Sequence, residues 1–180
     1  TYHCIITDDN SCTDSVGIII YEPVLLTATI ASDSVSCNGL ADGQATANPN
    51  GGTTSYSYAW DNGQSTQIAT GLIAGTYSCT VTDNNGCDTT VSVTIYEPTL
   101  LTATIASDSV SCNGGSDAAA TVFPSGGTVS VDYSYAWSNG QNTQTANGLS
   151  AATYYCIITD DNLCTDSVGI IIYEPVLLTA

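Results

Sequence analysis

The sequence repeats itself, and this repeat constrains the fold more than any other feature of the chain. The segment YEPVLLTATIASDSVSCNG begins at Tyr21 and returns at Tyr96 with one substitution, an offset of 75 residues. Trp60 and Trp137 are 77 residues apart, so the second copy carries a two-residue insertion, near residues 131–132. Self-similarity at a fixed period is the sequence signature of modular arrays.

A second comparison gives the long period of the array. Residues 1–28 match residues 153–180 at all but two positions, an offset of 152 residues. The differences are His3 against Tyr155 and Ser11 against Leu163. We therefore expect a window cut from a longer array that alternates two kinds of module.

The repeat predicts four parts in the chain. These are the C-terminal hairpin of a truncated preceding module (1–20), a first complete module (21–95), a second complete module (96–172), and the first strand of a truncated following module (173–180).

The pattern inside each module is typical of β-strands. In residues 76–82, TYSCTVT, the side chains of Tyr77, Cys79 and Val81 fall on one face. Turn sequences such as DNGQ (61–64) and DNNG (83–86) separate the runs. About seven short strands in roughly 75 residues favour a small immunoglobulin-like sandwich. We predict an all-β fold of tandem immunoglobulin-like β-sandwich modules in a head-to-tail array, with the YEP segments as junctions.

Composition removes several classes of function. The chain has no Lys and no Arg, and its 17 acidic residues give a net charge of -17. Nucleic-acid and phosphate binding need cationic side chains, and an anionic membrane surface would repel this chain. No run of 18 apolar residues is present, so we expect no direct membrane insertion.

Catalysis is not expected. The only His is His3, whose counterpart in the second module is Tyr155, so a Ser–His or Cys–His pair cannot recur in each module. The three Glu (Glu22, Glu97 and Glu174) all lie in YEP segments. There the Glu-Pro pair is expected to stiffen the linker, because Pro restricts its own φ and the residue before it.

Eight Cys in a chain rich in Thr, Ser and Gly favour an oxidising compartment, so we expect an extracellular or cell-surface protein. Reduced thiols in the core are the alternative. A zinc site is disfavoured, because even the closest Cys pairs, such as Cys79 and Cys87, have seven residues between them.

At this point the motifs resemble a known family. SCNG followed by DG (36–43), GGT…YSYAWDNGQ (51–64), GLIAGTYSCTVTDNNGC (71–87) and VSVTIYEP (91–98) are similar to the SprB-type repeat of gliding-motility and surface adhesins of Bacteroidota. The resemblance covers nearly the whole chain. It implies an immunoglobulin-like module that is exported by type IX secretion and displayed on the cell surface, with no catalytic residues.

The resemblance also implies a pairing of cysteines. The Cys of SCNG and the Cys of the NGC turn would be partners, giving Cys37–Cys87 and Cys112–Cys164. Cys79 and Cys156 stand where the family pattern has Val, so each module has a third Cys. We expect these two to be small buried hydrophobes; another pairing or an inter-chain bond is the alternative.

Two further kinds of candidate site involve short polar motifs. Acidic turns could offer calcium ligands, or their Asp and Asn could simply favour tight turns; the candidates are Asp8, Asp9, Asp83, Asp160 and Asp161. Calcium is the one cofactor left open. Asp-Ser-Val looks like the O-glycan acceptor motif of Bacteroidota, with acceptors at Ser15, Ser34, Ser109 and Ser167.

The second module differs from the first on the outward face of its last hairpin. Ser78, Thr80 and Thr94 of the first module correspond to Tyr155, Ile157 and Ile171 of the second, and Ile5 and Ile19 repeat the apolar pattern. An exposed apolar cluster is a liability unless something covers it. We predict that these five apolar residues form a lateral contact, with a neighbouring module or another copy of the chain; a merely tolerated face is the alternative.

The sequence thus predicts a structural or adhesive segment of a long secreted adhesin or extracellular filament. Its partners would be neighbouring modules, other copies of the chain, and surface polysaccharide. The alternative is a carbohydrate-binding repeat array attached to a secreted hydrolase. Such an array needs aromatic rings that face solvent, whereas Tyr56, Tyr58 and Trp60 share one face and are expected to form core.

Overall fold

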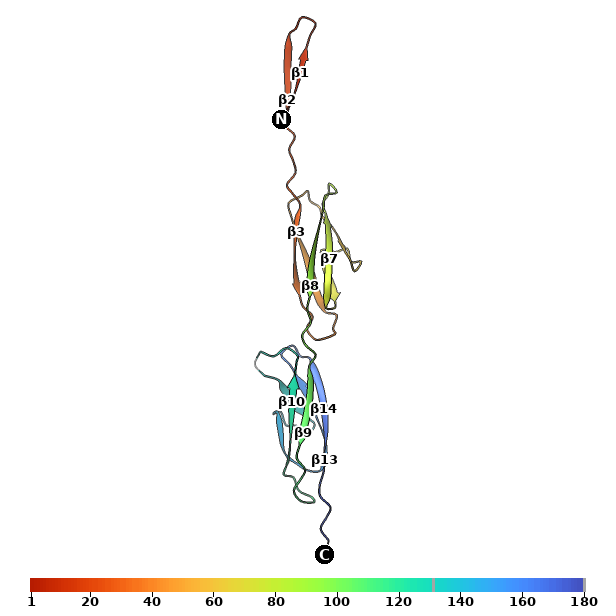
Figure 1. The fold of residues 1–180 in the computed structure, drawn as a ribbon, viewed down its shortest axis with the longest axis vertical. Coiled ribbons are helices and arrows are strands. Elements are labelled where there is room, and N and C mark those ends of the chain that lie inside the picture. The colour runs from red at the N-terminus through yellow and green to blue at the C-terminus, as the bar shows by residue number, and fades with distance from the viewer. Residues whose placement is uncertain (131, 180) are drawn as a thin grey trace.

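The computed structural model describes residues 1–130 and 132–179, and their regular secondary structure consists of β-strands. Figure 1 shows a narrow, elongated molecule in which a hairpin is followed by two modules placed one after the other. The predicted all-β fold of immunoglobulin-like modules is confirmed. Val131, within the predicted insertion, and Ala180, in the last predicted part, lie outside the described residues.

The first module is a sandwich of two three-stranded antiparallel sheets, in the orders β3-β4-β6 and β5-β7-β8. Its strands are β3 (Thr27–Asp33), β4 (Gly43–Asn50), β5 (Ser57–Trp60), β6 (Ile68–Leu72), β7 (Gly75–Thr82) and β8 (Asp88–Ile95). The sequence had predicted about seven strands. The structure has six, and residues 51–54, between β4 and β5, form bends around Gly51 and Gly52, whose φ angles are +75° and +62°.

The second module repeats this architecture, with sheets in the orders β9-β10-β12 and β11-β13-β14. Its strands are β9 (Thr102–Ser107), β10 (Ala118–Ser125), β11 (Ser134–Trp137), β12 (Thr145–Leu149), β13 (Ala152–Thr159) and β14 (Thr165–Ile172). Strand pairing stops before each Tyr-Glu-Pro segment, since β8 ends at Ile95 and β14 at Ile172.

The N-terminal hairpin consists of β1 (Tyr2–Thr7) and β2 (Thr13–Ile18), and it keeps the register of the last hairpin of each module. Cys4 faces Val16, as Cys79 faces Val91 and Cys156 faces Val168. All residues of β1 and β2 are exposed. The hairpin thus has the same local structure as β13–β14 without a second sheet to cover it.

Each module has its own apolar core, built from the inward positions of the alternating strands. In β7, Cys79 and Val81 are buried and Tyr77 is half-buried, as the alternation predicts. Trp60 is buried, and its indole N–H donates a hydrogen bond to the backbone carbonyl of Thr66 over 2.9 Å. Tyr56 packs against the same core, so the aromatic residues of SYSYAW are core residues and form no solvent-facing platform.

The direction of two strands decides where the cysteines lie. The backbone N–H of Val35, just after β3, donates to the carbonyl of Tyr96, just after β8, over 3.1 Å. Cys37 is therefore at the C-terminal end of the first module. Cys87 directly precedes β8, so the eight residues of that strand, about 26 Å at 3.3 Å per residue, separate it from this end.

Candidate functional site at the module junction

The SCNG segment of the first module forms a tight loop at the end that faces the second module. The carboxylate of Asp42 accepts hydrogen bonds from the hydroxyl of Ser36 over 2.5 Å and from its backbone N–H over 3.0 Å. These bonds, that of the hydroxyl first, hold the pKa of the Asp42 carboxyl below its ordinary value of 3.8. Gly39 adopts a φ of +77°, a conformation that favours glycine. The loop therefore presents Cys37 in a fixed position.

The acidic turn of the second module presents the other cysteine. Asp160 accepts hydrogen bonds from the backbone N–H groups of Asn162 over 3.0 Å, Cys164 over 2.8 Å and Thr128 over 2.8 Å. The turn is thus tied both to itself and to the loop after β10.

The first module has the same turn around Asp83. Its carboxylate accepts backbone N–H groups of Thr53 over 2.8 Å and of Asn85 and Cys87 over 2.9 Å each. These bonds, that from Thr53 foremost and with Gly86 adding to them, hold the pKa of Asp83 below 3.8 against the opposing effect of burial.

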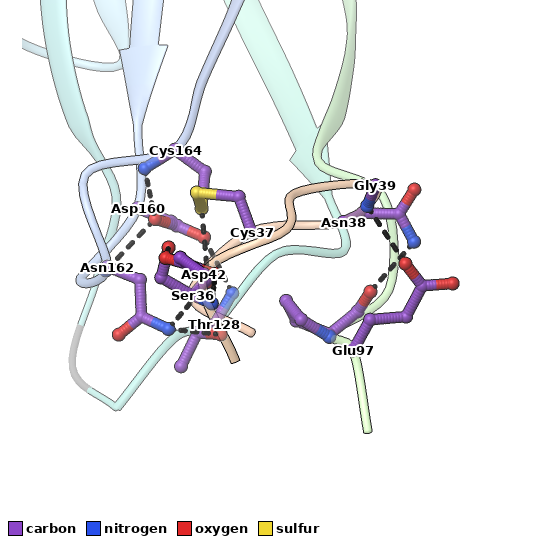
Figure 2. The surroundings of a disulfide bond; sticks show 11 residues. Ser36, Cys37, Asn38, Gly39, Asp42, Glu97, Thr128, Asp160, Asn162 and Cys164 are labelled. Carbon is purple, nitrogen blue, oxygen red and sulfur yellow. Dashed lines mark hydrogen bonds between the residues drawn. A yellow bond between two sulfur atoms is a disulfide. The ribbon is translucent and has the colours of Figure 1, made fainter. Parts of the chain in front are cut away.

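A disulfide joins Cys37 of the first module to Cys164 of the second, with Cα atoms 5.7 Å apart and a sequence separation of 127. Figure 2 shows the bond between the SCNG loop and the acidic turn. The predicted pairs Cys37–Cys87 and Cys112–Cys164 are therefore wrong. Cys87 and Cys112 are free and exposed, because in each module the SCNG cysteine and the turn cysteine lie at opposite ends of the last strand, β8 or β14, and a disulfide needs Cα atoms within about 7 Å.

Hydrogen bonds surround the disulfide on both sides. The side-chain amide of Asn162 donates to the carbonyl of Ser36 over 2.9 Å, across the junction. On the linker side, the amide of Asn38 donates to the carbonyl of Pro98 over 3.0 Å, and the backbone N–H of Gly39 donates to a carboxylate oxygen of Glu97 over 2.8 Å (Figure 2).

A pocket of about 260 Å³ lies beside the disulfide, with walls from both modules. Leu40 comes from the SCNG loop, Leu100 and Leu101 from the linker, and Leu163 from the acidic turn. Sequence reasoning found the cysteines and placed Glu97 in the junction, but it missed the bond of Glu97 to the SCNG loop and the roles of Asn38 and Asn162. Their recurrence at fixed distances from SCNG, YEP and the turn cysteine is the signal that could have identified them.

Cys79 and Cys156 are free and fully buried, in agreement with their interpretation as small hydrophobes. Burial raises the pKa of both thiols above the ordinary value of 9.0. Neither is therefore poised to react in the folded state.

The acidic turns show the geometry expected of turn-forming Asp. Both carboxylate oxygens of Asp83 and of Asp160 accept backbone N–H groups, and Asp8 accepts those of Asn10 and Cys12. Among the residues described, three or more His, Cys, Asp or Glu nowhere gather as a set that could hold a metal ion. Asp9 is exposed, as are the four O-glycan candidates Ser15, Ser34, Ser109 and Ser167, whose modification stays a prediction.

The predicted lateral face points to solvent. Tyr155, Ile157 and Ile171 are 59%, 49% and 50% exposed, and Ile5 and Ile19 are exposed on the hairpin. The ring of Tyr155 lies over Gly169, where an added Cβ would come within 2.8 Å of it. The first module has hydroxyl pairs on the same face, such as Thr76 with Thr94 at 3.1 Å. The two modules therefore differ in their outward chemistry, while the contact itself stays a prediction.

Comparison with known proteins identifies one family that resembles each module. Residues 29–65 and 104–142 match the family model of the SprB repeat, with one match in each module. SprB repeats occur in cell-surface proteins. None of the curated proteins compared with the chain matches it.

Solved structures with a similar arrangement contain immunoglobulin domains. One comprises the N-terminal four Ig domains of Dscam1 isoform 9.44, at 13% identity and a TM-score of 0.40, covering 96% of this chain and 53% of that one. Another is the amphioxus IgVJ-C2 molecule, at 14% identity and a TM-score of 0.33, covering 81% of this chain and 95% of that one. The chain thus spans about half the length of the Dscam1 structure. Among the described residues, no helix has the length and apolar character needed to cross a membrane.

Proposed function

We propose that this chain is a tension-carrying segment of an extracellular adhesin or filament, without catalytic activity of its own. The observation that carries the proposal is the Cys37–Cys164 disulfide, which joins consecutive modules covalently in addition to the linker. A bond in this position does little for the core of either module. Its effect is to fix the two modules to each other and to limit how far the chain can be stretched.

The linker supports the same role. Glu97 and Pro98 are docked on the SCNG loop by hydrogen bonds, so the junction has a second set of contacts besides the disulfide. A stiff series of modules is suited to hold an adhesive end away from a cell surface. Export by type IX secretion, a part in gliding, and binding of surface polysaccharide belong to this proposal as expectations from the SprB resemblance.

Single-molecule force spectroscopy tests the proposal. The two cysteines have a sequence separation of 127, so the loop closed by the disulfide corresponds to roughly 440 Å of chain at about 3.5 Å per residue. The oxidised chain, pulled by its ends, should not release this length, whereas the reduced chain should release it as the modules unfold. Release of several hundred ångströms from the oxidised chain would contradict the proposal. Cys37→Ser is the matched variant, since it should behave like the reduced chain under oxidising conditions.

A further inference from the structure

The exposed cysteine of the second module, Cys112, lies in a loop that already makes the linker contacts of a junction. The amide of Asn113 donates to the carbonyl of Pro175 over 3.1 Å, and the backbone N–H of Gly114 donates to Glu174 over 2.8 Å. These are the bonds that Asn38 and Gly39 make to the linker at the complete junction. Cys112 is therefore held as Cys37 is held, but its sulfur is free and exposed.

The pocket beside Cys112 lacks one wall. It measures about 330 Å³ and is lined by Ser111, Cys112, Asn113, Pro175 and the three residues that follow Pro175. At the complete junction, the corresponding pocket also has Leu163, Cys164 and Thr165 in its walls. The missing wall is thus the cysteine turn of another module.

The other half of the same junction occurs at the N-terminal end of the first module. A pocket of about 230 Å³ is lined by Asp83, Cys87, Asp88 and the linker residues 22–26. Here the cysteine turn and the linker are present, and the SCNG loop is missing. Cys87 is exposed and free, in a turn with the same hydrogen bonds as that of Cys164.

The apolar residues beside Cys112 indicate which partner fits. Leu178 is 95% exposed, whereas its repeat counterparts Leu26 and Leu101 are each 6% exposed because their own modules cover them. Gly51 and Gly126 lie in the loop after the second strand of their modules. They lie close to the backbone of Leu25 and Leu100, the residues directly before Leu26 and Leu101, so this loop covers the two Leu side chains. The surface around Cys112 therefore fits another module of the same repeat.

We propose that every junction between such modules carries this disulfide: Cys112 bonds to the turn cysteine of a module that follows it, and Cys87 bonds to the SCNG cysteine of a module that precedes it. The inference rests on the head-to-tail array of the proposed function. Cys79 and Cys156 are fully buried and do not compete for either partner, whereas Cys4 and Cys12 of the N-terminal hairpin are free and exposed.

Each bond forms by thiol–disulfide exchange with a disulfide oxidant, such as a thiol–disulfide oxidoreductase. One junction thiolate attacks a sulfur of the oxidant and releases the other sulfur as a thiolate. The second junction thiolate then displaces the oxidant from the mixed disulfide. The two cysteines together lose two protons and two electrons, and the oxidant's disulfide is reduced to two thiols.

In an array of such modules, the disulfides provide covalent routes that bypass most of the chain. Between Tyr21 and Tyr173, one two-module period, one route runs from Tyr21 to Cys37, across the disulfide, and from Cys164 to Tyr173. It contains about 25 residues, or roughly 90 Å fully extended, against roughly 530 Å for the whole period at about 3.5 Å per residue. Because this route uses only the Cys37–Cys164 bond of each period, that bond alone would keep an unfolding module from lengthening the fibre by much. The proposed Cys112–Cys87 bonds would add a second route of about 25 residues per period, from Cys87 to Cys112.

A seamless tandem chain tests the inference. Residues 21–28 and 173–180 are identical, so residues 1–172 can be joined to residues 21–180 of a second copy without changing the repeat. Cys4→Ser, Cys12→Ser and Cys87→Ser in the first copy and Cys112→Ser in the second leave one Cys112 and one Cys87, placed at the central junction, and remove the exposed thiols of the N-terminal hairpin. The tandem chain is refolded in reduced and oxidised glutathione, isolated as a monomer, alkylated, digested and mapped by mass spectrometry.

We expect a Cys112–Cys87 peptide beside the Cys37–Cys164 peptide. A control tandem that also carries Cys112→Ser in the first copy should have Cys87 alkylated and Cys37–Cys164 unchanged. Recovery of both Cys112 and Cys87 in alkylated form, with Cys37–Cys164 intact, would overturn the inference and leave the proposed function standing. Absence of Cys37–Cys164 as well would overturn both.

Discussion

The carboxylate of Glu97 accepts a hydrogen bond from the backbone N–H of Gly39 over 2.8 Å, and Glu174 makes the same bond to Gly114 over 2.8 Å. The bond explains why each SCNG loop in the repeat is followed by a linker that contains a Glu. The sequence indicated a linker stiffened by Pro. The structure adds that the linker is fastened to the module before it, which sets the direction in which the next module begins.

The first prediction concerns this bond. Glu97→Gln replaces a charged acceptor with a neutral one, and charge-assisted hydrogen bonds are about twice as strong as neutral ones. We expect both modules to stay folded and the Cys37–Cys164 disulfide to lose about two- to fivefold in its equilibrium with glutathione, from about 0.5–1 kcal/mol of weaker docking. Quantitative alkylation across a series of redox buffers measures this equilibrium.

Glu22→Gln is the control for this experiment. It removes one negative charge from the corresponding linker position, where the side chain is exposed and makes no hydrogen bond within the described part of the chain. An equal shift in both variants would mean that charge, and not the bond to Gly39, determines the effect.

The fold could be predicted from the sequence because its signals are local. Alternation in β7, glycines and Asn-Gly pairs at turns, and the 75-residue offset each act over a few residues or follow from self-comparison. The hairpin β1–β2 illustrates this, since it has the register of β13–β14 without a second sheet beside it.

The disulfide could not be predicted in the same way. The resemblance located Cys37 and Cys87 as a pair within one module, but the partner of a cysteine depends on which end of the module it occupies. β3 and β8 both end near the linker, which places Cys37 next to the following module and Cys87 a strand length away. Only the end-to-end placement of two modules brings Cys37 to Cys164.

The second prediction concerns the buried thiol of the first module. Cys79→Val should keep the fold with a change in unfolding free energy below about 1.5 kcal/mol, because it is a nearly isosteric apolar exchange. Cys79→Ser should lower this free energy by about 1–3 kcal/mol, since it buries a hydroxyl in an apolar core. Urea unfolding followed by Trp fluorescence measures both.

Thiol labelling provides the independent check on Cys79. In the native chain, iodoacetamide should modify Cys87 and Cys112 and should spare Cys79 and Cys156 until urea unfolds the modules. Rapid labelling of Cys79 under native conditions would show that the thiol is accessible and is not a core residue.

The third prediction is a dependence of stability on pH. The folded-state pKa of Asp83 lies below the 3.8 expected of the unfolded chain, because backbone N–H groups bind its ionised form. Its contribution to stability is therefore complete above pH 3.8 and is lost as the pH falls through the folded-state pKa. Asp83→Asn should lower stability at pH 6 and should flatten the decrease between pH 4 and pH 2, as measured by urea midpoints.

Asp88→Asn is the matched control for Asp83→Asn. It removes one negative charge from the exposed start of β8, five residues away, and leaves the hydrogen bonds of the turn in place. If the two variants gave the same stability at pH 6, the turn bonds of Asp83 would have no role in the folded state.

The last prediction concerns the apolar face of the second module. Ile157 and Ile171 are each about half exposed, and the equivalent positions of the first module are Thr80 and Thr94. Covering these side chains would contribute a few kcal/mol at about 25 cal/mol per Å² of apolar surface. The double variant Ile157→Thr, Ile171→Thr should therefore lose lateral association in sedimentation velocity, while its Trp fluorescence and unfolding free energy stay close to those of the parent chain.

Phe123→Thr is the control, because Phe123 is a half-exposed apolar residue on β10, in the other sheet of the same module. Association that survives the double substitution, or that the control abolishes equally, would show that the lateral contact lies elsewhere.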